Sequence, residues 1–265
     1  MTVNYSDCNR TFHLRFNFLS IKVSGSMEKL RQRMVDWIRG KVGQAKAKGV
    51  VLGLSGGLDS SVVAAICAQA LGPSGVLALI LPCESEKEEL AHAEEVAKKF
   101  GLKTELIDLT PIYEKLRQIL PQADQIPLAN IKPRLRMLTL YYYANQLNYL
   151  VVGTGNKCEL KVGYFTKYGD GGADILPLGD LLKSEVRSLA KLVGIPDHII
   201  DKVPTAGLWP GQTDEGEMGV AYAELEDFLL GYEKGQAPQG QKAEKIKSMM
   251  EKARHKLSLP EIFRK

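Results

Sequence analysis

The sequence is poor in cysteine, and its few cysteines lack the spacing of a metal site. Cys8, Cys67, Cys83 and Cys158 are spread through 265 residues without a Cys-x-x-Cys pair. This usage argues against a zinc site or a disulfide framework and favours reduced thiols in a cytoplasmic protein. We expect Cys67 to be a small core residue, because it lies on the apolar side of a predicted helix.

Long apolar runs and a dominant charge are also missing. No run approaches the roughly 20 residues needed to span a bilayer, and no signal-peptide core is present, so we expect no membrane partner. The 35 basic and 31 acidic residues leave a net charge of only +4 and are spread along the chain. This balance argues against a nucleic-acid partner and leaves room for anionic small-molecule substrates. With 45% hydrophobic residues, the chain can bury the core of one α/β domain.

The most informative segment, residues 55–61 with the sequence SGGLDSS, joins an apolar run at 50–54 to a helix-forming run at 60–71. A strand that ends at paired glycines and continues as a helix leaves free backbone N–H groups at the helix start. The helix dipole also favours an anion there. The segment therefore predicts a phosphate-binding loop.

This loop differs from two common phosphate-binding motifs. It lacks the lysine of Gly-x-x-x-x-Gly-Lys-Ser/Thr and the spacing of Gly-x-Gly-x-x-Gly. It offers serine hydroxyls, bare backbone at Gly56 and Gly57, and the carboxylate of Asp59, which suits a phosphate site when a divalent cation lies between them. The pattern is typical of pyrophosphate loops, found in enzymes that split ATP into AMP and pyrophosphate. An ordinary Gly-Gly turn is the alternative.

Apolar runs and helix-forming runs alternate along the rest of the chain. We predict strands at 50–54, 76–81, 103–108 and 150–153, and helices at 27–48, 60–71, 86–100 and 131–147. Strands joined by helices form a parallel sheet covered on both faces, and ligands bind beyond the carboxyl ends of such strands. The loops after Leu54, Leu81 and Gly153 should therefore meet at one cleft.

The first 26 residues fall outside this alternation. Apolar residues alternate there with polar positions, which is compatible with a short edge strand (Phe12, Leu14, Phe16, Phe18). We expect residues 1–26 to be a poorly ordered extension without a catalytic role, and residues 27–265 to form a single domain. A stretch rich in Gly, Gln and Lys at 231–241 is interpreted as a linker between two helices.

Three further regions make the chain resemble one family. They are NIKPRLRM at 130–137, GTGNKCE at 153–159 running into GYFTKYGDGGAD at 163–174, and PTAGLW at 204–209. Together with the loop at 55–61, they closely resemble ammonia-dependent NAD synthetase, from about Met27 to the His255-Lys256 pair. The resemblance implies a doubly wound, mostly parallel five-stranded sheet with helices on both faces, as in adenine nucleotide alpha-hydrolases.

The resemblance also implies a reaction, in which deamido-NAD is amidated with ammonia at the expense of ATP. The nicotinate carboxylate attacks the α-phosphorus and pyrophosphate leaves; ammonia then attacks the acyl-adenylate and AMP leaves. The protein's task is to hold two anions close together and to neutralise charge on the leaving pyrophosphate. The family forms homodimers with the dinucleotide site across the subunit boundary, which implies the same assembly here.

Individual residues take their implied roles from the family motifs. The ATP positions are Gly53, Leu54, Ser55, Gly56, Gly57, Leu58, Asp59, Ser60, Thr154, Lys183 and Thr205. The deamido-NAD positions are Arg134, Lys167, Asp174, His255 and Lys256, and the Mg²⁺ ligands are Asp59 and Glu159; no acid or base is assigned. Without the resemblance, Glu159 and Lys183 would be exposed residues at helix starts, and His255 with Lys256 a solvated pair.

One motif departs from the family pattern, and two other functions stay open. Gly155 and Asn156 stand where many bacterial members carry an aspartate and a histidine, so the roles of those two residues do not transfer. The chain has no room for an amidohydrolase domain, so free ammonia is expected unless a separate glutaminase supplies it. A tRNA-thiolating ATPase would need paired cysteines and a basic RNA surface. A noncatalytic nucleotide sensor would need the loop but neither Asp59 nor Glu159.

Overall fold

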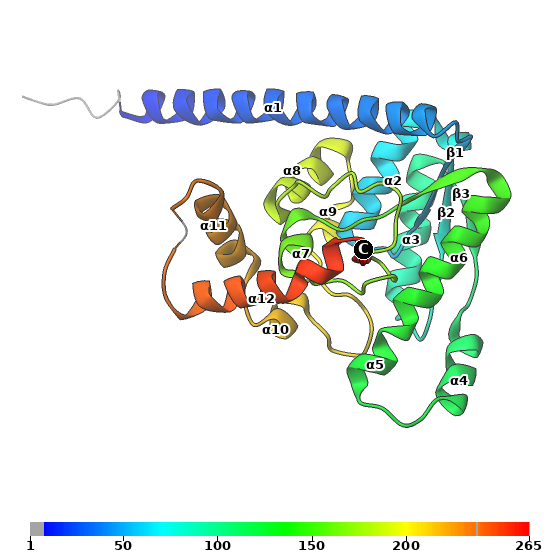
Figure 1. Ribbon diagram of the computed structural model, residues 1–265. Coiled ribbons are helices and arrows are strands. Elements are labelled where there is room, and N and C mark those ends of the chain that lie inside the picture. The colour runs from blue at the N-terminus through cyan, green and yellow to red at the C-terminus, as the bar shows by residue number, and fades with distance from the viewer. Residues whose placement is uncertain (1–7, 237, 265) are drawn as a thin grey trace, which may run out of the picture.

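The computed structural model describes residues 8–236 and 238–264, with side chains from Gly25 onward. Strands and helices alternate along these residues (Figure 1). The strands are β1 (Gly49–Gly53), β2 (Val76–Ile80), β3 (Lys103–Leu106) and β4 (Tyr149–Val152). The helices are α1 (Cys8–Gln44), α2 (Leu58–Leu71), α3 (Lys87–Phe100), α4 (Thr110–Ile119), α5 (Gln125–Ala129), α6 (Ile131–Leu147), α7 (Lys157–Val162), α8 (Lys183–Val193), α9 (Asp197–Ile200), α10 (Asp214–Met218), α11 (Tyr222–Glu233) and α12 (Gln241–Leu257), with a 3-10 turn at Pro73–Gly75.

The strands form a parallel sheet in the order β3-β2-β1-β4. In the centre, Val50 of β1 pairs with Val76 of β2 on one side and with Leu150 of β4 on the other. β1 is almost wholly buried, as expected for a short apolar strand covered on both faces. The four predicted strands, and the helices predicted at 60–71, 86–100 and 131–147, are confirmed to within two residues at each end.

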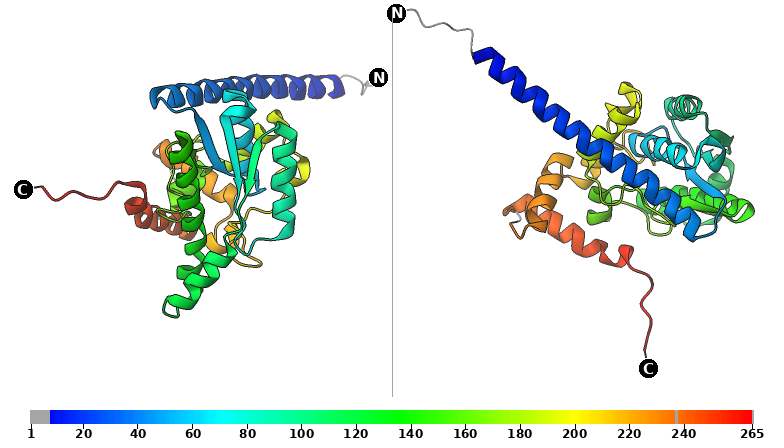
Figure 2. Two further views of the ribbon diagram at one scale, coloured as in Figure 1. Left: turned by 90° about the vertical axis from the view of Figure 1, so that its right-hand side faces the viewer. Right: turned by 90° about the horizontal axis from the view of Figure 1, so that it is seen from above.

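Alternate residues of the strands contribute to two cores on opposite faces of the sheet. Val50 and Leu52 pack with residues of α1, α2, α3 and α8, whereas Val51 packs with residues of α4 and α6. Cys67 of α2 is fully buried in the first core, as predicted. Helices therefore cover both faces (Figure 2), and the doubly wound α/β fold is confirmed.

The sheet has four strands within the described residues, where five were expected. Beside β4, the next segment makes a single parallel bridge between Val152 and Ile175. The Gly153 N–H donates to Ile175 O at 2.9 Å, and the chain then turns away. Pro177 follows two residues later and has no N–H with which to extend a ladder, which explains why a fifth strand does not develop.

α1 begins at Cys8, well before the predicted helix start at residue 27, and it ends at Gln44 rather than at residue 48. The edge strand considered for residues 12–18 is therefore wrong. A helix that is already formed gains one hydrogen bond for each residue added, and α1 runs along the outside of the domain, away from any sheet edge (Figures 1 and 2). The division between residues 26 and 27 lies inside this helix and stays a prediction. The predicted apolar side of the helix is buried at Met34, Val35, Ile38 and Val42.

A third layer packs beside the sheet rather than on either face. α7, α10, α11 and α12 share a separate core, which includes Met218, Phe228 and Ile246 (Figure 1). The linker predicted at 231–241 is shorter in the structure, because α11 continues to Glu233 and α12 begins at Gln241. Among the described helices, none combines the length and the apolar character needed to cross a bilayer. The layer bears on function because α7 and α10 both carry acidic residues to the carboxyl edge of the sheet.

We predict that Ile38→Ala lowers the free energy of unfolding by about 2–5 kcal/mol, because it opens a cavity where α1 packs on α2. Ile38 is fully buried at that contact. Removal of residues 1–26 should change the free energy of unfolding by less than about 1 kcal/mol, because the buried side of α1 stays in place. Denaturant titration of both variants checks this. If the truncated protein loses as much free energy of unfolding as Ile38→Ala does, the N-terminal part of α1 must pack against the domain, and the prediction is wrong.

Candidate active site

The predicted phosphate loop, residues 53–60, lies at the carboxyl edge of the sheet. β1 ends at Gly53 and α2 begins at Leu58. The strand order changes direction between β1 and β4, the place where parallel α/β proteins bind ligands. Gly57 precedes α2 and provides no side-chain cap. The first N–H groups of α2 are therefore available to an anion.

Gly56 fixes the path of the loop over α3. Its φ of +76° lies in the left-handed region, where glycine is favoured. A methyl group at this position would collide with the backbone carbonyl of Glu89 and lie 3.0 Å from the backbone nitrogen of Ala93. The loop backbone therefore packs directly on α3, and a larger residue would displace it.

The serine hydroxyls of this segment are engaged within it. Ser55 Oγ lies 3.0 Å from Ser60 Oγ and accepts a hydrogen bond from the Gly57 N–H at 3.3 Å. Ser60 and Ser61 donate to Gly57 O at 3.1 Å and 2.7 Å. These bonds hold the loop in one shape. The predicted contact of the Ser55 and Ser60 hydroxyls with pyrophosphate stays a prediction.

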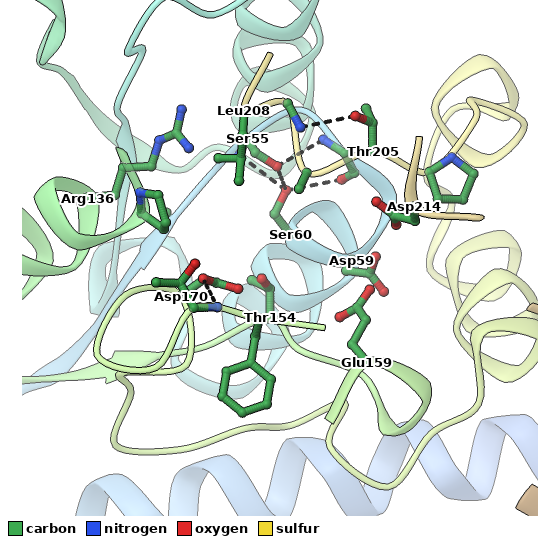
Figure 3. A pocket seen from close by; sticks show the side chains of 18 of the residues that line it. Ser55, Asp59, Ser60, Arg136, Thr154, Glu159, Asp170, Thr205, Leu208 and Asp214 are labelled. Atoms are coloured by element: carbon green, nitrogen blue, oxygen red, sulfur yellow. Dashed lines mark hydrogen bonds between the residues drawn. The ribbon is translucent and has the colours of Figure 1, made fainter. Parts of the chain in front are cut away.

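A cavity of about 520 Å³ opens at this edge of the sheet (Figure 3). The loops after β1, β2 and β4 meet at it, as predicted. Most of the predicted ATP residues line it, and both predicted metal ligands are among the lining residues: Gly53, Leu54, Ser55, Gly57, Leu58, Asp59, Ser60, Thr154, Glu159, Lys183 and Thr205. Gly56 lies outside this lining, because it packs against α3.

Lys183, the first residue of α8, joins the two predicted metal ligands. Its Nζ lies 2.5 Å from Asp59 Oδ2 and 3.4 Å from Glu159 Oε1. The side chains of Lys183, Asp59 and Glu159 are 5%, 18% and 16% exposed, respectively. The interpretation of Lys183 and Glu159 as exposed residues at helix starts is therefore wrong. Asn156 completes the group, since its Nδ2 donates to Asp59 Oδ1 at 3.2 Å while its Oδ1 caps α7.

Burial and charge shift the pKa values in this group. Burial, followed by the neighbouring charge of Asp59, raises the pKa of Glu159 to about 7. Burial alone would lower the pKa of Lys183, but the charges of Asp59 and Glu159 outweigh it and raise that pKa. Lys183 is therefore always charged, whereas Glu159 takes up a proton near neutral pH.

Asp59 and Glu159 fit a magnesium ion that arrives together with phosphates. Their carboxylates come from different helices and converge on the same lysine. In the part of the chain that the structure describes, no group of three or more His, Cys, Asp or Glu has the spacing of a metal site. Magnesium commonly takes one or two carboxylates and completes its shell with phosphate oxygens and water. The donor set thus suits a metal bound with a nucleotide.

A polar group on the third layer reaches the same cavity through Tyr164, Asp214 and Glu217, and of these only Tyr164 lies in a sequence motif. Tyr222 OH lies 2.9 Å from Asp214 Oδ2 and 3.3 Å from Glu159 Oε1. Tyr164 OH donates to Glu217 Oε2 at 2.9 Å. Burial raises the pKa of Asp214 and of both tyrosines. The acidic run at the start of α10, which begins four residues beyond the PTAGLW segment, is a sequence signal for this group.

Arg136 and Asp170 line another wall of the cavity (Figure 3), and sequence alone singled out neither. Arg136 Nε donates to Leu81 O at 3.0 Å, and its Nη2 donates to Ser85 Oγ at 3.3 Å. Asp170 Oδ1 accepts from the Thr166 N–H at 2.9 Å. Burial lowers the pKa of Arg136 and raises the pKa of Asp170. Arg136 therefore brings a cation to the loop after β2.

The predicted deamido-NAD residues are only partly brought together. Lys256 lines the cavity, and its Nζ donates to Gly163 O and Phe165 O, both at 2.8 Å. The other four members lie outside the lining: Arg134, Lys167, Asp174 and His255.

Two of these outer residues have contacts that tie the segment at 163–174 to its neighbours. Lys167 Nζ donates to His255 O, which links the segment to α12. Asp174 accepts from Tyr141 OH at 3.0 Å and from the Val151 N–H at 2.7 Å, which links the segment to α6 and β4.

The sheet order, the loop after β1 and the cavity define a class of protein, the parallel α/β proteins that carry a glycine- and serine-rich phosphate loop between a strand and its helix. Comparison with known proteins narrows this class. The family model for NAD synthase matches residues 30–260, so this chain belongs to the NAD synthase family.

Individual relatives agree with this membership. The chain is 48% identical over 241 residues to the NH(3)-dependent NAD(+) synthetase of Archaeoglobus fulgidus, which covers 90% of this chain and 98% of that protein. The structure of NMN synthetase from Francisella tularensis has a TM-score of 0.83 and 40% identity, covering 89% of this chain and 98% of that one. The structure of NH3-dependent NAD synthetase from Campylobacter jejuni has a TM-score of 0.78 and 32% identity, covering 90% of this chain and 99% of that one. The expected family and fold are confirmed.

We predict that Glu159→Gln, measured in EDTA, stabilises the protein by on the order of 2 kcal/mol near pH 8 and has little effect near pH 5. The usual glutamate pKa is 4.5 and the folded pKa is about 7. Ionisation of Glu159 therefore lowers stability progressively between these values, and the loss is complete above pH 7. Free energies of unfolding at the two pH values check this. Asp227→Asn, at an exposed carboxylate of α11 with no ion pair to any described residue, serves as the control. Equal effects of Glu159→Gln at both pH values would contradict the assignment.

Proposed function

We propose that this protein is an ATP-dependent ligase that amidates deamido-NAD with ammonia, giving NAD, AMP and pyrophosphate. The observation that carries the proposal is that four separate segments of a NAD synthase family member meet in one cavity: the phosphate loop, Thr154, Lys183 and Thr205. Identity of 48% to an archaeal NH(3)-dependent NAD(+) synthetase, over nearly the full length of both chains, supports ammonia as the nitrogen source.

In the first half of the reaction, the nicotinate carboxylate forms a bond to the α-phosphorus of ATP and pyrophosphate leaves. The N–H groups at the start of α2 and the ammonium of Lys183 stabilise charge that grows on the pyrophosphate. Thr154 and Thr205 offer hydroxyls to the nucleotide from neighbouring loops. Asp59 and Glu159 would hold Mg²⁺, which supplies further neutralisation of phosphate charge.

In the second half, the nitrogen of ammonia forms a bond to the acyl carbon, and the bond from that carbon to the phosphate oxygen breaks. AMP leaves with the electron pair, the nitrogen gives up one proton to water, and the nicotinamide of NAD remains. Adenylation is needed because a carboxylate would have to expel oxide, a far poorer leaving group than phosphate. The chain's contribution to both halves is to hold the reacting groups close together in a fixed environment of charge.

The dinucleotide is proposed to contact Arg134, Lys167, Asp174, His255 and Lys256. Cations suit its pyrophosphate and carboxylate, and an aspartate suits its ribose hydroxyls. Because four of these residues lie outside the cavity lining, we propose a homodimer in which the second subunit completes the outer site. Leu138 and Tyr142 of α6, each 64% exposed, suit such an interface.

Nicotinate mononucleotide is a second candidate for the acid substrate. The observation that favours it is the similarity to a Francisella tularensis structure described as NMN synthetase. The mononucleotide carries the same carboxylate but lacks the adenylate half of deamido-NAD. It would therefore use the phosphate loop and Lys183 in the same way, without needing outer residues such as Arg134 and Asp174.

Steady-state assays of the purified protein with ATP, Mg²⁺, ammonium chloride and either acid test the proposal. We expect NAD, AMP and pyrophosphate in equal amounts from deamido-NAD. A kcat/KM more than about tenfold higher for nicotinate mononucleotide would select the second candidate. Formation of ADP, turnover that requires tRNA, or ATP binding without turnover would each contradict the proposed ligase.

Asp59→Asn should leave the fold nearly intact and lower the rate of adenylation by roughly 100-fold, because a charged oxygen ligand is lost beside the phosphates. Pyrophosphate exchange into ATP in the presence of deamido-NAD measures this step. Asp227→Asn is the matched control, since its exposed carboxylate on α11 lies away from the cavity lining. A full exchange rate for Asp59→Asn at limiting Mg²⁺ would show that the metal assignment is wrong.

A further inference from the structure

Lys132 of α6 is buried near the cavity but is not one of the residues that line it. The residue is 3% exposed. Its Nζ forms an ion pair with Glu84 Oε2 at 2.8 Å and donates to Leu208 O at 2.9 Å. The same Nζ lies 5.0 Å from the centre of the Tyr113 ring. Lys132 therefore joins the loop after β2, the loop of residues 204–209 and α4.

Stability alone does not account for a lysine at this buried position. An ion pair taken out of water seldom stabilises a fold more than apolar side chains of similar size, because desolvation offsets the attraction. An apolar side chain could also pack on the Tyr113 ring, and Glu84 has a second cation in Arg117 at 3.3 Å. No apolar side chain can donate to Leu208 O, so this contact is the one that needs the lysine.

Glu84 holds Lys132 from a constrained backbone. Its φ of +55° lies in the left-handed region, which residues other than glycine seldom adopt. The Glu84 N–H donates to Thr110 Oγ1 at 3.0 Å, and Glu84 Oε1 accepts from Arg117 at 3.3 Å. Backbone strain of this kind persists only where the surrounding contacts impose it, and it is common at functional sites. The carboxylate of Glu84 is thus fixed in place to receive Lys132.

Leu208 lies in the same loop as Thr205, a position proposed for ATP. Figure 3 shows both residues on the side of the cavity where the phosphate loop lies. The Leu208 N–H donates to Gln212 Oε1 at 2.8 Å, so the loop itself holds the N–H while Lys132 holds the carbonyl. The Gly207 N–H donates to Thr205 Oγ1 at 3.1 Å, which links the Thr205 side chain to the backbone next to Leu208.

We infer that Lys132 is a positioning residue, which holds the loop of residues 204–209 against the loop after β2 and thereby directs the Thr205 hydroxyl toward the nucleotide. The inference rests on the proposed function, which places ATP in this cavity. It goes beyond that function by assigning a residue outside the cavity lining, which acts on the nucleotide only through Leu208 and Thr205.

The test is Lys132→Met, which keeps an unbranched side chain of nearly the same length against Tyr113 and removes the donor to Leu208 O. We expect the Kd for ATP to rise roughly 10-fold, because the Thr205 hydroxyl is no longer held toward the phosphates. Calorimetric titration with ATP and Mg²⁺, without an acid substrate or ammonium, measures this Kd.

Arg117→Met is the matched control. Arg117 shares the Glu84 carboxylate and the Tyr113 ring with Lys132, but it forms no hydrogen bond to residues 204–209 in the part of the chain that the structure describes. Its removal should leave the Kd for ATP within about twofold of the unmodified protein. A rise as large as that in Lys132→Met would show that the contact with Leu208 is not the important one, and the inference would be wrong.

A double-mutant cycle with Thr205→Val separates positioning from packing. We expect Thr205→Val to raise the Kd at least as much as Lys132→Met. The double variant should lie within about twofold of Thr205→Val alone, since both changes remove the same contact with ATP. Effects that multiply in the double variant would overturn the inference. A lysine with a merely structural role would lower the free energy of unfolding and leave the Kd unchanged, and that result would overturn it as well.

Glu84→Gln provides a second variant, which covers the case in which Lys132→Met does not fold. It keeps the shape of a partly exposed side chain and removes the charge that holds Lys132, so the Kd for ATP should rise by roughly threefold or more. An unchanged Kd in this variant would count against the inference.

These outcomes are distinct from those that test the proposed function. The Kd is measured without turnover, so a failure of the unmodified protein to form NAD, AMP and pyrophosphate would refute the ligase and leave the role of Lys132 to be decided by the cycle. A failure of the unmodified protein to bind ATP would overturn both.

Discussion

The buried ammonium of Lys183 is the interaction on which the site depends. Three helices begin at this point, and Lys183 joins α8 to Asp59 of α2 and to Glu159 of α7. The helix dipoles favour the two carboxylates near the starts of α2 and α7 but oppose the lysine at the start of α8. A buried ammonium without partners costs on the order of several kcal/mol, so at least one of the two carboxylates must be charged for Lys183 to stay in place. The three helix starts are therefore fixed relative to one another by charge.

The walls of the cavity are held less firmly than its base. Lys132 Nζ donates to Leu208 O at 2.9 Å, and Lys256 Nζ donates to Gly163 O at 2.8 Å. These lysine-to-carbonyl contacts fasten the loops that carry Thr205 and Tyr164, whereas the phosphate loop is continuous with the central strand of the sheet. A loop attached at few points opens at a smaller free-energy cost than a strand paired on both sides. The structure thus combines a phosphate loop that is continuous with the central strand and walls that are fastened by a few side-chain contacts.

The parts that could be predicted from sequence are those set by local pattern. The strand, the glycines and the helix of the phosphate loop are contiguous, and α6 has the bounds that its pattern predicts, Ile131–Leu147. The fifth strand does not develop because Pro177 interrupts its ladder. The alternating residues at 12–18 lie in a helix because α1, once formed in its packed part, continues toward the N-terminus through them. Asp214 escaped prediction because its place at the cavity depends on the contact between the third layer and the sheet.

Some parts of the site leave a motif in the sequence and others do not, and this difference follows from how each part is built. Adenylation needs a phosphate loop, and such a loop is built from neighbouring residues, which leave a motif in the sequence. A buried group of hydroxyls and carboxylates can instead be assembled from distant segments, and such a group leaves no motif. In this protein Tyr222 makes the connection, because its hydroxyl contacts Glu159 at the edge of the sheet and Asp214 of α10. A single phenol therefore couples the adenylation residues to the buried acid of α10, across the boundary between two separately packed cores.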